Sequence, residues 1–180
     1  PMRIGLGFGI LLLFLTMTGC ASTTTALKED YQREHGKPGL REKAVLTYAP
    51  EVPPPIQRKQ PAVLEVHLNS SVEKTEIKSG VFYEYWSFNS QVPGPFIRAR
   101  VGDVLEVHHT NSDASGMPHN IDFHSVTGPG GGAPVTTVVQ GEERIAWFKM
   151  LHPGLFIYHC AAPPVMDHIA NGMYGLILVE

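Results

Sequence analysis

The segment FIYHCAAPPVMDHIANGMYGLILVE, residues 156–180, places a histidine and a cysteine side by side, at His159 and Cys160. The apolar and aromatic residues before this pair favour a β-strand. Neighbouring residues of a strand point to opposite faces of the sheet. The imidazole and the thiol therefore face different surroundings, and each needs partners on its own side.

Short apolar-rich segments separated by glycine, proline, asparagine and aspartate continue this pattern from residue 61 to residue 180. Many short strands with regular turn signals predict an all-β protein, either a sandwich or a barrel. These 120 residues are enough for one β-sandwich core and too few for two. The expected strands are 62–68, 81–88, 96–100, 103–109, 119–125, 134–139, 144–150, 154–160 and 174–180, with a helical turn at 165–170.

Residues 1–20 have the composition of a secretion signal. Arg3 precedes the apolar run IGLGFGILLLFL, and the sequence up to Cys20 resembles the cleavage region of a bacterial lipoprotein signal. The run is shorter than the roughly 20 residues that span a bilayer. We therefore expect Cys20 to be the lipidated N-terminus; an ordinary signal peptide with a chance cysteine is the alternative. Residues 21–60 are polar and contain several prolines, and we expect a flexible, unstructured linker there, ahead of a domain at 61–180.

Charge and cysteine content narrow the function. The net charge is −3 and no basic stripe occurs, which argues against nucleic-acid binding. Cys20 and Cys160 are the two cysteines, so acylation of Cys20 leaves Cys160 without a disulfide partner. An exported thiol is open to oxidation unless it is buried or binds a metal. The composition therefore favours a metal-bound Cys160.

The parity of strand positions sorts the candidate ligands into two groups. In MPHNIDFHS, His119 and His124 are five residues apart, so they face opposite sides of a regular strand, and Asp122 shares the side of His124. His159 and Cys160 also face opposite sides. We therefore expect His119 to share one side with Cys160, and Asp122 and His124 to share the other with His159.

The residues after Cys160 add two further candidates, His168 and Met173. A cysteine, two histidines and a methionine are the ligands of blue-copper electron-transfer sites. Zinc is the rival metal, but structural zinc sites favour paired cysteines, and the sequence contains no C-x-x-C. The adjacent His108 and His109 cannot share a ligand face, and we expect solvated strand histidines there. His67 carries no pattern.

Three segments carry a resemblance to a known family: YWSFNSQVPGPFIRARVGD, MPHNIDFHSVTGPGGGAP and PGLFIYHCAAPPVMDHIANGMYGLILVE. They resemble the first cupredoxin domain of copper-containing nitrite reductases, in particular the lipid-anchored outer-membrane subgroup, from about residue 50 to residue 180. The resemblance implies a cupredoxin-like Greek-key β-sandwich and two kinds of copper. It implies that His119, Cys160, His168 and Met173 bind type 1 copper, that His124 and His159 bind type 2 copper, and that Asp122 is the catalytic carboxylate.

The same resemblance implies the reaction and the partners. The reaction is the reduction of nitrite to nitric oxide, with an electron passing from type 1 copper through Cys160 and His159 to type 2 copper. The electron donor would be a small cupredoxin or a c-type cytochrome. In the family, each subunit has two cupredoxin domains, three subunits form a ring, and a neighbouring subunit supplies a third histidine. We therefore expect an N-terminal part of a periplasmic, outer-membrane-anchored enzyme whose type 2 site is incomplete in this chain alone.

Other functions remain as alternatives. A membrane-tethered, single-domain type 1 copper electron carrier would need the cysteine group, but it has no use for Asp122, His124 and His159. A metal-free interaction module would need neither group. Laccase-like multicopper oxidases need His-x-His pairs, one of them around the cysteine, and here Ala161 follows Cys160. We therefore do not expect four-electron reduction of oxygen.

Overall fold

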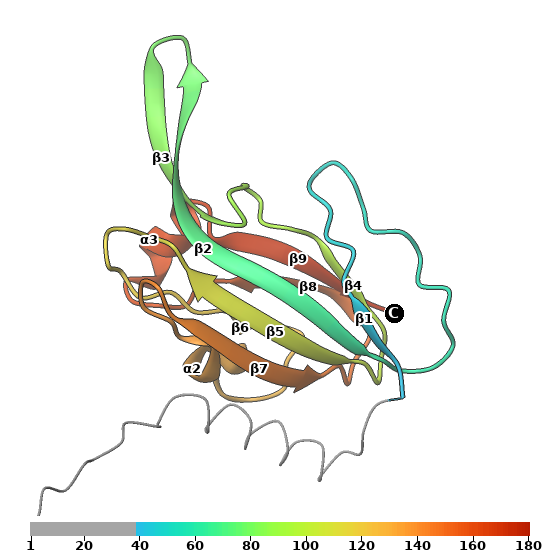
Figure 1. Ribbon diagram of the computed structural model, residues 1–180. Coiled ribbons are helices and arrows are strands. Elements are labelled where there is room, and N and C mark those ends of the chain that lie inside the picture. Colours follow the sequence, from blue (N-terminus) through green and yellow to red (C-terminus); the bar gives the residue numbers. More distant parts are fainter. Residues whose placement is uncertain (1–38) are drawn as a thin grey trace, which may run out of the picture. The chain divides into compact units, whose positions relative to one another are not determined.

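The structure is a computed structural model that describes residues 39–180, and two β-sheets in this part of the chain face each other (Figure 1). The first sheet has the order β1-β2-β5-β7, with β3 also paired to β2, and the second has the order β4-β9-β8-β6. The described strands are β1 (Arg41–Lys43), β2 (Val63–Lys78), β3 (Val81–Phe88), β4 (Ile97–Ala99), β5 (Val104–Asn111), β6 (Asp122–Phe123), β7 (Glu143–Lys149), β8 (Gly154–His159) and β9 (Tyr174–Val179). The described helices are η1 (Pro129–Gly132), α2 (Ala133–Thr136) and α3 (Val165–Ala170).

The core lies between the two sheets, because each strand turns alternate apolar side chains inward. Val66, Val107 and Phe148 reach it from the first sheet, and Tyr158 and Ile177 reach it from the second. Burial of side chains of this size contributes roughly 1.5–3 kcal/mol each. The sequence prediction of an all-β sandwich is confirmed.

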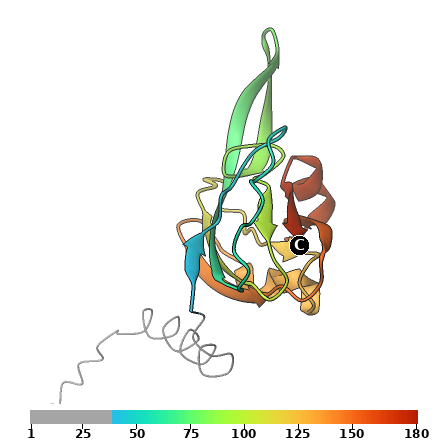
Figure 2. The ribbon, with the colours of Figure 1, turned by 90° about the vertical axis from the view of Figure 1, so that its right-hand side faces the viewer.

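The hairpin of β2 and β3 extends beyond the rest of the sandwich (Figures 1 and 2). Its strands pair from Ser70 with Phe88 out to Lys78 with Val81. Gly80, with φ of 72°, makes the turn between them. The expected strand at 62–68 ends ten residues earlier than β2. It therefore lacks the part of β2 that forms the outer half of the hairpin.

The expected linker differs from the structure in its second half, because residues 39–60 lie on the domain. β1 pairs in parallel with β2, and Thr47 bridges to Phe96. The Arg58 guanidinium donates a hydrogen bond of 2.6 Å to the buried carboxylate of Asp103. The proline content of this segment favours extended chain, and the ion pair then fixes that extended chain on the sandwich. Residues 21–38 and the expected signal at 1–20 lie outside the described residues.

Two of the expected strands also differ from the elements that the structure shows. Residues 134–139 begin as α2, because Pro134 stands at the first turn of the helix, where its fixed φ is favourable. The Thr136 hydroxyl then bonds the N–H and the carbonyl of Ile121 and fixes α2 on the sheet. The expected strand 119–125 shortens to β6, whereas the expected helical turn at 165–170 is present as α3.

His109 is buried, although we expected a solvated strand histidine. Its Nε2 lies 2.8 Å from the Ser70 hydroxyl, and its Nδ1 lies 2.7 Å from the Thr136 carbonyl oxygen. Burial lowers the pKa of His109 to about 4. Its imidazole is therefore a neutral part of the core near neutral pH.

Within residues 39–180, no helix is both long enough and apolar enough to cross a lipid bilayer.

Candidate metal centres

His119, Cys160 and His168 converge in a buried group, called here the inner cluster. Cys160 directly follows β8, His168 belongs to α3, and His119 is held by a two-way backbone bridge to Val138. The Cys160 Sγ lies 3.2 Å from the His168 Nδ1 and 3.8 Å from the His119 Nδ1. The two Nδ1 atoms are themselves 3.2 Å apart. Three donor atoms thus surround one point.

Asp113 orients one of these donors. Its Oδ2 lies 2.9 Å from the His119 Nε2. The pKa of Asp113 is lowered: burial alone would raise it, but bonds from the Ser115 backbone, the His119 ring and the Ser115 hydroxyl outweigh burial. Because an ionised carboxylate only accepts hydrogen bonds, the His119 proton is on Nε2. The His119 Nδ1 therefore presents a lone pair to Cys160 and His168, as a metal-ligating histidine does.

Burial disfavours charge on the donors of the inner cluster. Burial raises the pKa of the Cys160 thiol. Burial, together with repulsion from His119, lowers the pKa of His168 to about 4. A neutral imidazole is the form that binds metals, and a soft thiolate with two imidazoles suits copper or zinc.

Met173 and Trp86 complete the surroundings of the inner cluster. Met173 is fully buried, its N–H bonds the His168 carbonyl, and its carbonyl accepts the Cys160 N–H, both at 3.0 Å. These bonds hold the three residues of the predicted Cys-His-Met set against one another. The Trp86 ring meets the His168 imidazole edge to face, with centroids 4.8 Å apart. The methionine and the tryptophan give the cluster an apolar boundary.

Asp122, His124 and His159 form a second group near the surface, called here the outer cluster. Asp122 of β6 is the antiparallel cross-strand partner of His159 of β8, so their side chains share one face. His124 follows β6, and its Nε2 lies 3.1 Å from the His159 Nε2. The ligand atoms of all three residues lie within 4.8 Å of one another.

A backbone contact fixes the imidazole of His159, much as Asp113 fixes the imidazole of His119. Its Nδ1 lies 3.0 Å from the Cys160 carbonyl oxygen. A carbonyl can only accept, so the His159 proton is on Nδ1, and its Nε2 presents a lone pair toward His124. The structure therefore forms both of the groups that strand parity predicted. One group lies on each side of the His159–Cys160 peptide.

The glycine-rich loop at residues 128–132 packs directly against the outer cluster. Gly131 of η1 has φ of 51°, in the left-handed region. A Cβ at Gly131 would overlap the Asp122 carboxylate and the backbone of Phe123. Only glycine therefore fits beside this carboxylate without moving it.

Sequence reasoning missed the residues that position the ligands. Asp113 lies six residues before His119 in a turn, where an aspartate is expected for local reasons. Asn120 accepts the Ala161 N–H at 2.7 Å and lies near the Cys160 sulfur, so it fixes the residue after the thiol. The alternation of strand residues carries no signal for either role. Cys20, the expected lipidation site, lies outside the described residues.

Comparisons with known proteins identify the family of the chain. A family model described as multicopper oxidase matches residues 69–180, and the chain therefore belongs to the multicopper oxidase family. A copper-containing nitrite reductase of Neisseria meningitidis is 55% identical over 138 residues, which are 76% of this chain and 36% of that protein. A copper-containing nitrite reductase of Alcaligenes xylosoxydans is 38% identical over 146 residues, 78% of this chain and 44% of that protein.

Solved structures show the same fold. A multicopper oxidase crystal structure matches with a TM-score of 0.60 and 29% identity. The match covers 78% of this chain and 47% of the chain in that structure. A copper nitrite reductase from Nitrosomonas europaea has a TM-score of 0.55 and 33% identity, and covers 64% of this chain and 41% of its own. The fold is a cupredoxin-like β-sandwich, as the resemblance implied. The chain spans about a third to under half of the length of these curated relatives.

Proposed function

We propose that this chain is the first cupredoxin domain of a copper-containing nitrite reductase. In this proposal the inner cluster, with Met173, binds type 1 copper, and the outer cluster supplies His124 and His159 to type 2 copper. One observation carries the proposal: two groups of potential ligands, each with a pair of imidazoles, lie on either side of the peptide that joins His159 to Cys160. The names of the relatives add independent support.

The donor sets fit the two roles. The inner cluster supplies a thiolate and two imidazoles in a buried, apolar site, and the outer cluster supplies two imidazoles and a carboxylate at the surface. When bound, copper would accept one electron at the inner site and act as a Lewis acid toward nitrite at the outer site. The peptide between Cys160 and His159 is the shortest covalent connection between the clusters, and we assign the electron path to it.

The reaction consumes one nitrite, one electron and two protons, and yields nitric oxide and water. Asp122 shares the face of His124 and His159, so its carboxyl group would deliver a proton to the departing oxygen as a positioned general acid. Gly131 leaves room for this carboxylate beside the two imidazoles.

A catalytic metal site needs three protein ligands and one open position, as zinc sites illustrate. The outer cluster has two imidazoles within residues 39–180. We therefore propose that a second domain from a neighbouring subunit of a homotrimer supplies the third histidine. A small cupredoxin or a c-type cytochrome would supply the electron.

We further propose that Cys20 is lipidated and anchors the protein to the outer membrane on the periplasmic side. Two acyl chains make such anchoring stable. Fractionation of cells that express Cys20→Ser tests this localisation. The variant should leave the membrane fraction, and equal membrane binding by variant and wild type would contradict the anchor.

A nitrite assay with a chemical reductant tests the enzymatic role. The copper-loaded full chain should accept an electron and produce negligible nitric oxide. A fusion to the second part of the Neisseria meningitidis relative should produce nitric oxide continuously. Steady turnover by the chain alone would contradict the incomplete outer site. A coloured fusion without turnover would favour the alternative, a membrane-tethered type 1 copper electron carrier.

A further inference from the structure

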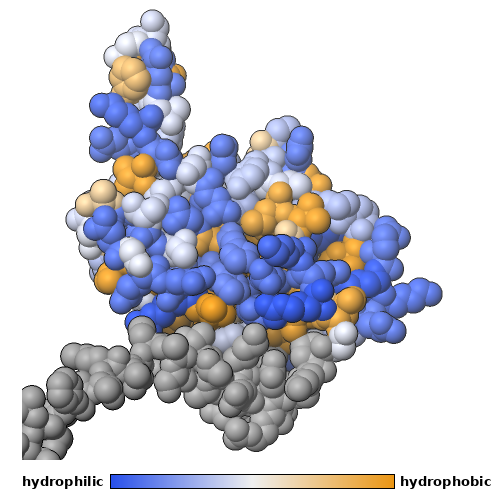
Figure 3. Space-filling model, in the orientation of Figure 1, coloured by the Kyte–Doolittle hydropathy of each residue, from blue (hydrophilic) through white to orange (hydrophobic). Residues whose placement is uncertain are grey.

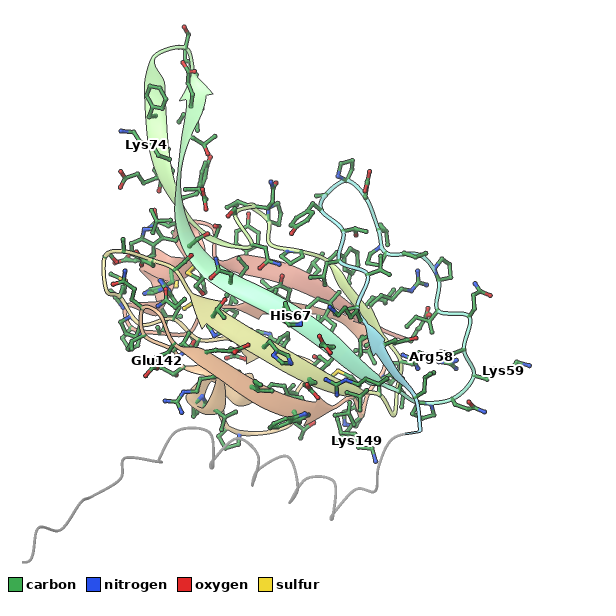
Figure 4. All side chains as sticks on the ribbon, in the orientation of Figure 1. Arg58, Lys59, His67, Lys74, Glu142 and Lys149 are labelled. Carbon is green, nitrogen blue, oxygen red and sulfur yellow. The ribbon has the colours of Figure 1, made fainter. Side chains whose placement is uncertain are left out.

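A third group of ligating side chains lies on the outer face of the first sheet, on different strands from the inner and outer clusters. Along β2, burial alternates so that Glu65 and His67 point away from the core. Along β5, Glu106 and His108 lie on the same outward side. The parallel register pairs Glu65 with Glu106 and His67 with His108. Figure 4 labels His67 on this face, and hydrophilic residues gather over β2 and β5 in Figure 3.

The two histidines of this face are in direct contact. Their rings stack with centroids 4.4 Å apart and an interplanar angle of 18°. The ligand atoms of Glu65, His67 and His108, called here the sheet-face cluster, lie within 4.8 Å of one another. Two ligands at about 2.1 Å from a tetrahedral zinc ion lie about 3.4 Å apart. The donors are therefore close enough to reach one ion once their side chains rotate toward it.

Neighbouring carboxylates prepare His108 for a cation. Its Nε2 lies 2.9 Å from Glu106 Oε1, and its Nδ1 lies 3.1 Å from Glu143 Oε1. A neutral imidazole carries one N–H, so only one of these contacts is a hydrogen bond at a time. The other nitrogen offers a lone pair. A carboxylate on the far nitrogen orients a ligating histidine and raises its basicity.

Glu106 is itself held rigidly. Arg41 donates to Glu106 Oε2 at 2.6 Å, and the Trp147 Nε1 donates to the same oxygen at 3.0 Å. The carboxylate that orients His108 is therefore held in place by two further donors.

The local charge also suits a divalent cation. The carboxylates of Glu65, Glu106 and Glu143 surround the histidines, and Arg41 is the cation bonded to two of them. With neutral imidazoles, three carboxylates and one guanidinium leave two negative charges. Glu65 Oε1 lies 2.7 Å from the His67 Nε2, so one ion could replace the shared proton and join both groups.

We propose that Glu65, His67 and His108 form a surface site for a divalent late transition-metal ion, with zinc as its probe. Two imidazoles and a carboxylate are a donor set that zinc accepts. The site shares no residue with the inner or outer cluster, so it does not depend on the proposed reductase activity.

Equilibrium dialysis of the full chain against buffered zinc tests the site. Zinc that binds elsewhere is common to all variants, so the difference between variants isolates the sheet-face cluster. His67→Gln and His108→Gln should each bind one ion fewer per chain at a zinc concentration that just saturates wild type, which corresponds to a site weakened about a hundredfold. His152→Gln replaces an exposed histidine outside the cluster and should keep the wild-type number. Equal numbers in all four proteins would overturn the proposal.

A second measurement guards against loss of folding. The imidazole nuclear magnetic resonance signals of His67 and His108, assigned with the same variants, should move together as zinc is added to wild type. Both should reach saturation at one zinc concentration. If neither signal moves, or if the two signals move at different concentrations, the shared site is wrong.

Discussion

The inner and outer clusters lie back to back at the end of β8, yet their surroundings are opposite. The inner cluster is fully buried, with an apolar boundary, and a carboxylate that fixes one imidazole. The outer cluster is partly exposed, and its members include a carboxylate of their own. Enclosure limits movement of ligands and water, which suits transfer of an electron alone. Exposure leaves room for a small anion and for protons. Under the proposed function, this difference suits the inner cluster to electron uptake and the outer cluster to the chemistry.

The largest expected effect is a loss of activity from a change in the outer cluster that leaves the inner cluster intact. In the fusion with the second part of the Neisseria meningitidis relative, Asp122→Asn removes the proposed proton donor. Nitric oxide formation should fall by about 10²–10⁴-fold, the usual contribution of a positioned general acid. The visible spectrum should not change, because Asp122 faces away from Cys160.

Glu84→Gln is the control for this variant, because Glu84 is an exposed carboxylate on the hairpin. It should keep wild-type turnover. If Asp122→Asn matches it, Asp122 has no role in proton delivery.

An intermediate effect is expected at the inner cluster. Asp113→Asn replaces the ionised partner of His119 by a neutral amide, which can also favour the wrong tautomer of the imidazole. Copper affinity at the inner cluster should fall by about 10–100-fold, as for other partners of ligating histidines. Competition with a chelator, followed by visible absorption, measures this affinity. An unchanged affinity would show that Asp113 does not position His119.

A smaller effect is expected from the glycine-rich loop. Gly131→Ala costs about 1–2 kcal/mol from the left-handed backbone alone, and its Cβ must displace the Asp122 carboxylate. Gly130→Ala is a matched control, since Gly130 has φ of 52° but its Cβ would meet Pro134 at an ordinary 3.6 Å. Both variants should unfold at a lower temperature than wild type. Turnover of the fusion should fall further for Gly131→Ala, and equal turnover would mean that the loop does not hold Asp122.

Sequence reasoning predicted the all-β sandwich and the separation of His119 and Cys160 from the residues of the outer cluster, because strand alternation is a local property. His168 was named from the ligand set of blue-copper sites and not from alternation. His159 and Cys160 needed only their adjacency to be placed on opposite faces. Local patterns could not predict contacts made by the path of loops through space. Asp113, Asn120 and Gly131 act through such contacts.

The same limit explains the other differences. The docking of residues 39–60 depends on Arg58 reaching Asp103, 45 residues away in the chain. The burial of His109 depends on Thr136, and the meeting of His67 with His108 depends on the register of two strands far apart in sequence. Spacing along one segment contains none of this information.

The proposed electron path requires Cys160 of the inner cluster to be a copper ligand. The most direct measurement is the visible absorption spectrum of the full chain with one equivalent of cupric ion, for wild type and for Cys160→Ser. Wild type should show an intense band from sulfur-to-copper charge transfer, and the serine variant should lose it completely. A colourless copper-loaded wild type, or a band that survives in Cys160→Ser, would contradict the claim.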